Sequence, residues 1–180
     1  MVRKCSKCGE EDIVFWLTPE GRKCIYCMYN IKRKKKVKSK MKNNPEYIIL
    51  HCSATKDSPT LSWDDIRRYH TKVKKWRTIG YHYGIEKIED SYEILVGRFE
   101  EEVGAHCIGL NSKSIGICFM GNIDTEDIEK EQWEVGLKLV RSICNRYNIK
   151  YENVKGHREF ADYKTCPGIR FDVEKFIKEL

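Results

Sequence analysis

The sequence lacks any run of about eighteen or more apolar residues, which excludes a transmembrane helix of ordinary length. The charged start, with Arg3 and Lys4, is not followed by the apolar segment that a secretory signal peptide requires. The sequence also lacks an internal repeat, which excludes a repeat architecture. We therefore expect a protein that is made in a cytosol and carries no conventional export signal.

The composition is that of a globular chain. Of 180 residues, 41% are hydrophobic and 34% are charged, which is enough apolar material for one sizeable core and a small satellite. A disordered chain is excluded on the same ground. The nine cysteines would be unusual as disulfides in a reducing compartment, so metal binding or simple burial is the better expectation for them.

Positive charge is concentrated at the N-terminus. Residues 1–45 hold 13 Lys and Arg against 4 Asp and Glu, a net charge of +9, which leaves −2 of the overall +7 for the remaining 135 residues. Most of the excess lies in residues 31–42, which contain no acidic residue. A segment of this kind repels itself and stays solvated. We predict a basic linker over residues 31–45 that joins two modules.

Two Cys-x-x-Cys pairs characterise the first module, residues 1–30. Fifteen residues separate the pair Cys5 and Cys8 from the pair Cys24 and Cys27. This spacing is typical of a structural zinc site with four thiolate ligands, in which the intervening chain returns as a hairpin. A module this short cannot be held together by burial alone, so the metal would supply its folding free energy. It resembles the short zinc ribbons of phage and mobile-element proteins.

Residues 46–180 have the pattern of an α/β domain with a mixed sheet flanked by helices. Strands are predicted over 47–51, 81–88, 92–96 and 114–120. Helices are predicted from the N-cap Ser62 to about residue 76, over 126–147, and from about 172.

The two longer predicted helices each have an apolar stripe that we expect to be buried. The stripe of the first consists of Ile66, Tyr69, His70, Val73 and Trp76; that of the second consists of Trp133, Leu137, Val140, Cys144 and Tyr147. We assign Cys144 to core packing, and His70 and His82 likewise.

Two histidines and a cysteine form the candidate catalytic site. His51 ends a strand, where alternation turns its neighbour Cys52 to the opposite face. His157 and Cys166 flank a polar loop about a hundred residues later. Such a ligand set suits a zinc ion whose fourth position stays open for water, and this water can reach a pKa near ~7. The pattern therefore predicts a hydrolase.

Several motifs occur in the order of one known family. They are Leu50-His51-Cys52-Ser53-Ala54-Thr55, Ile79-Gly80-Tyr81-His82-Tyr83, Val103-Gly104-Ala105-His106, Asn111-x-x-Ser114-Ile115-Gly116-Ile117, Gly156-His157-Arg158-Glu159 and Lys164-Thr165-Cys166-Pro167-Gly168. With these motifs, residues 46–176 resemble the zinc amidases of the type 2 N-acetylmuramoyl-L-alanine amidase and peptidoglycan recognition protein superfamily. Within that superfamily they are most similar to the short phage endolysins.

The resemblance implies a reaction and a set of residue roles. Zinc-bound hydroxide would attack the amide between N-acetylmuramic acid and the L-alanine of the stem peptide in bacterial peptidoglycan. The zinc ligands would be His51, His157 and Cys166. Two further residues would stabilise charge and assist proton transfer, namely Tyr81 and Lys164. We expect another two to line the substrate groove, namely His106 and Asn111.

The resemblance also implies a biological setting. As an endolysin, the protein would be made in the cytoplasm of an infected cell and would reach the wall after membrane permeabilisation. A cytosolic amidase that acts on recycled wall fragments is the alternative. We expect two zinc ions per chain, one catalytic and one structural, and a monomer.

A nucleobase deaminase is a weaker interpretation, based on the His-x-Glu triplet at His157 and Glu159. Deaminases complete their zinc site with a downstream Pro-Cys-x-x-Cys, and only Cys166 follows here. We therefore reject this class and expect Glu159 to be structural rather than a proton shuttle.

Two alternatives outside the enzyme class stay open. The domain could recognise peptidoglycan without cleaving it, although noncatalytic members of the family usually lack the metal-binding cysteine, which this sequence has at Cys166. The basic N-terminal module could instead contact nucleic acid or a polymerase and make the protein a regulator. Its charge would equally suit the anionic polymers of a bacterial wall.

Overall fold

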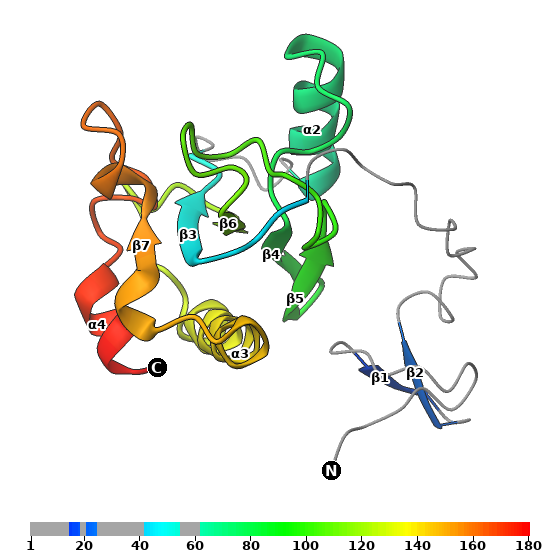
Figure 1. The fold of residues 1–180 in the computed structure, drawn as a ribbon. Coiled ribbons are helices and arrows are strands. Elements are labelled where there is room, and N and C mark those ends of the chain that lie inside the picture. The colour runs from blue at the N-terminus through cyan, green and yellow to red at the C-terminus, as the bar shows by residue number, and fades with distance from the viewer. Residues whose placement is uncertain (1–14, 19–20, 25–41, 55–61) are drawn as a thin grey trace. The chain divides into compact units, whose positions relative to one another are not determined.

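The chain divides into two compact units, Met1–Ser39 and Lys40–Leu180. A computed structural model describes residues 15–18, 21–24, 42–54 and 62–180 (Figure 1). No helix in these ranges is long and apolar enough to cross a membrane.

The described part of the first unit is an antiparallel strand pair, β1 (Phe15–Thr18) and β2 (Gly21–Cys24). Phe15 pairs with Cys24, so the chain turns back between the two Cys-x-x-Cys pairs, as the predicted hairpin requires. Cys5, Cys8, Cys27 and most of the predicted linker lie outside the described residues.

The second unit is built on a mixed five-stranded sheet, which confirms the predicted fold class. In sheet order its strands are β5 (Ser91–Val96), β4 (Tyr83–Ile88), β6 (Ser114–Phe119), β3 (Tyr47–Cys52) and β7 (Val154–Gly156). All are parallel except β5, which forms a hairpin with β4. The carboxyl ends of four strands therefore meet at one edge of the sheet, where ligands bind in open α/β sheets.

The larger core lies on one face of the sheet, under α3 (Lys130–Tyr147) and α4 (Val173–Lys178) (Figure 1). The side chains of Ile48, Leu50 and Cys52 enter this core, so Cys52 does point away from the face that His51 occupies. Cys144 is 2% exposed in the same core, which confirms its assignment to packing.

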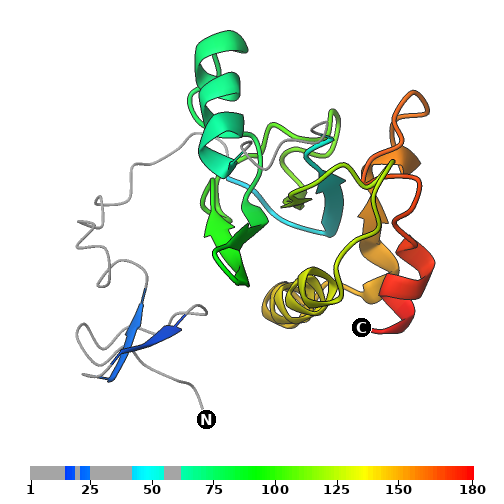
Figure 2. The ribbon, with the colours of Figure 1, turned by 180° about the vertical axis from the view of Figure 1, so that it is seen from behind.

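A smaller core lies on the opposite face, under α2 (Trp63–Arg68), and Figure 2 shows α2 and α3 on opposite sides of the sheet from behind. Ser62 caps this helix in a capping box with Asp65, as its sequence predicts. The buried contacts of α2 come from Trp63 and Ile66, which pack with Ile79 and Cys118.

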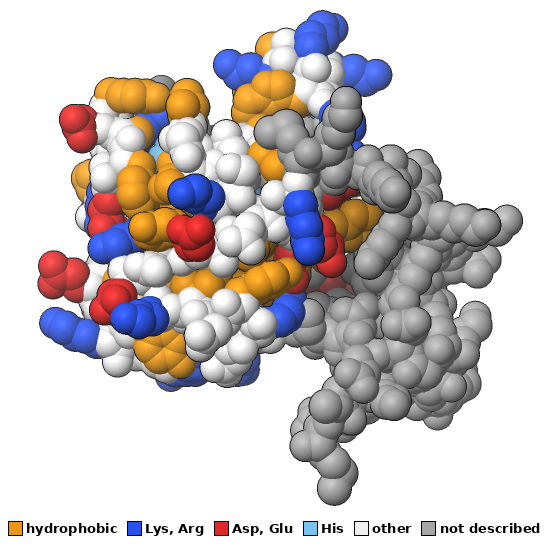
Figure 3. Space-filling model, viewed as in Figure 1, with side chains coloured by type: hydrophobic (Ala, Val, Ile, Leu, Met, Phe, Trp, Pro, Cys, Tyr) orange, Lys and Arg blue, Asp and Glu red, His pale blue; other side chains and the backbone are white. Residues whose placement is uncertain are grey.

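Beyond Ile66, the apolar stripe predicted for this helix is wrong at Tyr69, Val73 and Trp76. The chain continues α2 as a π-helical turn, η1 (Tyr69–Val73), whose wider repeat rotates the following side chains away from the sheet. His70 stays buried, but Tyr69 and Val73 are 48% and 63% exposed. Lys and Arg side chains surround this projecting end, at the top of Figure 3.

Three boundaries also differ from the predictions. Helix α3 begins at Lys130 rather than 126, because Thr125 and Glu126 donate their amides to the Asn122 carbonyl in a turn. Strand β4 begins at Tyr83, so Tyr81 precedes the strand rather than starting it. The predicted linker ends earlier than residue 45, because the Asn43 side chain is buried and bonds to the carbonyls of Glu100 and Ser114.

The sequence did not predict β7 or the two short 3-10 turns around it, η2 (Tyr151–Asn153) and η3 (His157–Glu159). A strand of three residues is too short to show a period-2 pattern. Its placement matters, because it is the strand that brings the second half of the candidate site to the edge of the sheet.

Candidate metal centre

The register of two parallel strands brings the two predicted histidine ligands together. In the β3 and β7 pair, Leu50 lies opposite Gly156, so the residues that follow them, His51 near the end of β3 and His157 just after β7, lie side by side. Their ring centroids are 4.6 Å apart. This neighbourhood follows from the parallel arrangement, since equivalent positions on parallel strands share one edge.

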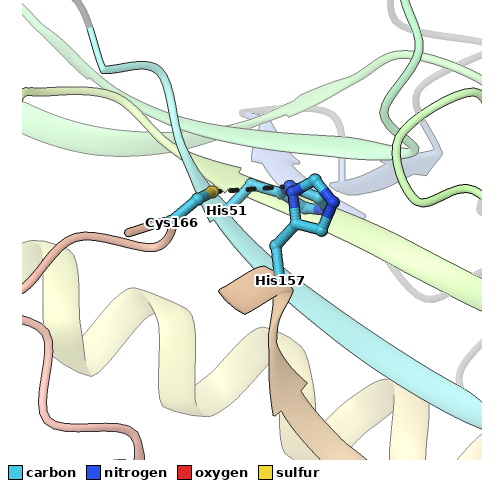
Figure 4. A group of neighbouring side chains, drawn as sticks. All are labelled: His51, His157 and Cys166. Carbon is cyan, nitrogen blue, oxygen red and sulfur yellow. Dashed lines mark hydrogen bonds between the residues drawn. The ribbon is translucent and has the colours of Figure 1, made fainter. Parts of the chain in front are cut away.

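The loop after η3 adds the cysteine. The Cys166 sulfur lies 3.6 Å from Nδ1 of His51, a contact that the dashed line in Figure 4 marks beside the His157 ring. The potential ligand atoms of His51, His157 and Cys166 all lie within 4.8 Å of one another. The structure therefore brings together the three residues that the sequence predicted as ligands of the catalytic metal.

The charge state of the two histidines suits metal binding. Burial lowers the pKa of His51 well below its ordinary value, and the neighbouring His106, His157 and Lys164 lower it further. Burial and then the charge of Lys164 lower the pKa of His157. Both imidazoles are therefore neutral near pH 7, and only the neutral imidazole can ligate a metal.

The Cys166 thiol, unlike the two imidazoles, must lose a proton before it can ligate a metal. Its hydrogen bond with Cys52 raises the pKa of Cys166, and burial raises it further. The Cys52 amide donates to the Cys166 sulfur over 3.3 Å. A thiol in this setting becomes a thiolate when a cation lies beside it. Two imidazole nitrogens and one sulfur are a donor set that zinc prefers, so these residues fit the metal that the sequence implied.

Hydrogen bonds from Arg158 in η3 and to Asp124 hold the cysteine loop in place. The Arg158 amide donates to the Cys166 carbonyl, and the Arg158 guanidinium donates to the carbonyls of Gly168 and Phe171. From the other side, the Asp124 carboxylate accepts from Thr165 Oγ1 and from the Ile169 amide. Sequence reasoning missed both residues, although Arg158 stands inside the Gly-His-Arg-Glu motif.

Glu159 has a structural role, as expected. Its carboxylate accepts from the Gly156 amide over 2.8 Å and pairs with Lys155 over 3.0 Å. These contacts stabilise the turn that begins at His157.

The Tyr81 ring lies beside the candidate ligands. Its centroid is 5.0 Å from that of His51, and Trp63 stacks on it at 6.2 Å. Burial raises the pKa of its phenol well above 10, so the hydroxyl stays protonated and able to donate a hydrogen bond.

Lys164 is exposed, and its ammonium group lies 5.5 Å from the centroid of the Tyr163 ring. Its charge is close enough to the site to lower the pKa of both His51 and His157.

His106 and Asn111, which the sequence predicted to line the substrate groove, both contact other groups of the protein. His106 is 9% exposed and lies behind His51, with its Nδ1 3.1 Å from Nε2 of His51. The Asn111 side-chain oxygen accepts from the amides of His106 and Cys107. These contacts are internal to the protein, and the role of both residues in the substrate groove stays a prediction.

The two remaining histidines bind backbone groups. Nδ1 of His70 accepts from the Gly80 amide, and the ring nitrogens of His82 contact the Gly116 amide and the Glu102 carbonyl. Both are buried, which confirms their assignment to packing.

Comparison with known proteins identifies the same region of the chain. The family described as N-acetylmuramoyl-L-alanine amidase matches residues 41–169. The endolysin of Escherichia phage T7 is 33% identical over 144 residues, which cover 78% of this chain and 91% of that protein. Peptidoglycan-recognition protein SC2 of Drosophila melanogaster is 31% identical over 137 residues, 73% of this chain and 72% of that protein.

Solved structures show the same fold. The endolysin N-acetylmuramoyl-L-alanine amidase LysCS from Clostridium intestinale superposes with a TM-score of 0.67 at 32% identity, covering 76% of this chain and 84% of that one. Drosophila PGRP-LB gives a TM-score of 0.63 at 28% identity, covering 74% and 81%.

Proposed function

The chain belongs to the N-acetylmuramoyl-L-alanine amidase family, and we propose that it is a phage endolysin that cleaves the amide between N-acetylmuramic acid and L-alanine in peptidoglycan. The observation that carries the proposal is the convergence of His51, His157 and Cys166 at the carboxyl edge of the sheet. In this role the protein is made in the cytoplasm of the infected cell and reaches the wall once the membrane has been permeabilised.

His51, His157 and Cys166 would hold a zinc ion. When bound, zinc would supply a water nucleophile at neutral pH and a positive charge beside the substrate carbonyl. The protein contributes a preformed donor set, because both imidazoles are already neutral and the cysteine loop is fixed by Arg158 and Asp124.

Tyr81 and Lys164 would act on the substrate. The protonated phenol of Tyr81 would donate a hydrogen bond to the oxygen on which negative charge develops as the amide is attacked. The Lys164 ammonium adds a positive charge on the exposed side of the site. The amine of the departing peptide needs a proton, and these two side chains carry acidic hydrogens beside the ligands that would assist its transfer.

The test is hydrolysis of purified cell walls, followed by release of a covalently attached dye and by mass spectrometry of the products. We expect new amino termini on L-alanine, loss of release with a chelator, and recovery when zinc is added back. A protein that sediments with walls yet yields no new amino terminus would be a recognition module, and the enzyme proposal would be wrong.

A second zinc ion would be bound by Cys5, Cys8, Cys24 and Cys27. The spacing of the two pairs supports this, as does the β1–β2 hairpin between them. Elemental analysis of the full chain should give two zinc ions, and Cys24→Ser should reduce the count to one without loss of amidase activity on a soluble muropeptide.

The basic N-terminal residues 1–45 would direct the enzyme to anionic wall polymers. Their net charge of +9 against −2 for the rest of the chain supports this. Compared with the full chain, residues 40–180, which keep the buried Asn43, should then lose activity on intact walls, and the difference should shrink towards ~1 M salt, where the screening length is ~3 Å. Equal lysis by both at low salt, with salt-sensitive DNA binding only by the full chain, would favour the nucleic-acid alternative.

A further inference from the structure

We propose that His106 is a positioning residue, which accepts a hydrogen bond from His51 and thereby aims the Nδ1 atom of His51 at the metal site. The inference rests on the zinc site proposed above. Nε2 of His51 and Nδ1 of His106 are 3.1 Å apart, and the two rings are nearly perpendicular at 85°. Both side chains are buried, at 1% and 9% exposure.

Tautomer chemistry fixes the direction of this hydrogen bond. His51 faces Cys166 with Nδ1, so Nδ1 is the atom available to a metal. A ring nitrogen that ligates a metal carries no hydrogen, and the neutral ring must then carry its hydrogen on Nε2. Among the described residues, the hydrogen-bond partner of that nitrogen is Nδ1 of His106, which therefore has to accept. Contacts of this kind orient metal ligands and increase their basicity.

The second ring nitrogen of His106, Nε2, also supports a functional role for this residue. When Nδ1 accepts, the hydrogen of His106 lies on Nε2. This nitrogen is buried and has no hydrogen-bond partner among the described residues. An unpaired buried polar atom is unfavourable, so a residue needed only for packing would be better replaced by an apolar one.

Two glycines pack against the His106 ring and restrict where it can lie. A Cβ atom on Gly116 would lie 2.6 Å from Cγ and Cδ2 of His106, and one on Gly104 would lie 2.5 Å from Cδ2. Both glycines thus make room for the imidazole. The backbone at residue 106 is held by the hydrogen bond from its amide to the Asn111 side chain, which explains the second residue that sequence reasoning had assigned to the substrate groove.

The experiment compares three variants of the full chain. His106→Leu removes the acceptor but keeps an apolar side chain, and His106→Asn restores an acceptor near the position of Nδ1. His70→Asn is the matched control, because His70 is a buried histidine whose recorded ring-nitrogen contact is to the backbone. Competition with a chromogenic chelator gives the affinity for zinc, and the metal that Cys166→Ser fails to bind defines the site.

We expect His106→Leu to weaken zinc binding at this site about 10- to 100-fold, and we expect His106→Asn and His70→Asn to stay close to the wild type. In zinc-loaded wild type, ¹⁵N NMR of the histidine rings should show His106 protonated on Nε2. A folded His106→Leu protein with wild-type zinc affinity would overturn the proposal. So would an equal loss in His106→Leu and His106→Asn, which would indicate packing rather than acceptance.

These outcomes differ from a failure of the proposed function. If the wild type binds no zinc that depends on Cys166, or cleaves no amide, the proposed function is wrong. If it binds zinc and cleaves while the His106 variants bind as tightly, only the positioning role is wrong.

Discussion

The five histidines of this chain fall into two groups that burial alone does not distinguish. His51 and His106 contact each other through ring nitrogens, whereas His70 and His82 bind backbone groups. Burial is the largest cause of a lowered pKa in all four. A lowered histidine pKa therefore does not locate the site here. The identity of the partner does, and the fifth histidine, His157, completes the first group.

We call the residues around His51, His106 and His157 the metal side, and His70 and His82 with their backbone partners the backbone side. The comparison predicts that variants on the metal side change zinc binding and amidase activity, while variants on the backbone side change the stability of the fold. The largest effect should come from the ligands themselves. Cys166→Ser or His157→Ala should abolish dye release from walls, because two remaining ligands do not hold a catalytic zinc ion. Sedimentation with walls should persist, since the basic residues 1–45, which we propose direct the enzyme to wall polymers, are unchanged in these variants. Cys144→Ala, a core cysteine far from any ligand in sequence, should keep both properties.

Sequence patterns could predict this metal side only in part. They predicted the three ligands, because each stands in a short polar motif after a strand or in a loop. They could not predict that His106 lies behind His51, because the two residues are 55 positions apart in the sequence and no local pattern connects them. The π-helical turn after Arg68 was equally hidden, because its residues continue a regular apolar stripe.

The fold, like the site, could be predicted from the sequence only in part. The sequence pattern predicted the four longer strands of the sheet and the capping box of α2. It did not predict the strand β7, because three residues give no period and its place is set by pairing with β3. Much of the site geometry depends on that pairing, through Leu50 and Gly156.

The next effect should come from the two side chains that act on substrate. Tyr81→Phe and Lys164→Ala should each slow turnover about 10²- to 10³-fold, by analogy with the loss of one oxyanion donor. Bound zinc should not change, because neither residue is a ligand. Tyr163→Phe and Lys178→Ala, both at exposed positions, are the matched controls. Unchanged rates in both test variants would show that these roles are wrong.

On the backbone side, His82 should make stability depend on pH. Burial lowers its pKa from 6.5 to about 4 in the folded protein, so the folded state binds the proton more weakly than the unfolded chain. The stabilisation is fully present above pH 6.5 and is lost as pH falls towards 4. A shift of this size corresponds to about 3 kcal/mol.

Denaturant unfolding between pH 7 and pH 4 measures this loss. His82→Asn, which has no titrating ring, should show a shallower dependence on pH, although it is less stable at pH 7. An identical slope in the variant and the wild type would place the acid sensitivity elsewhere.

The smallest effect should come from Asp124. Its carboxylate contacts the loop that carries Cys166 and does not contact a candidate ligand itself. Its two hydrogen bonds, to Thr165 and to the Ile169 amide, lie at an exposed position, where each contributes about 0.5 kcal/mol, so that together they contribute about 1 kcal/mol. Asp124→Ala should therefore weaken zinc binding by no more than about tenfold. Asp127→Ala, which removes only a surface ion pair with Arg170, should leave zinc affinity unchanged. An equal loss of zinc affinity in Asp124→Ala and His106→Leu would contradict this order. It would mean that fixing the loop that carries Cys166 matters as much as orienting the ring of His51, and that backbone contacts also belong to the metal side.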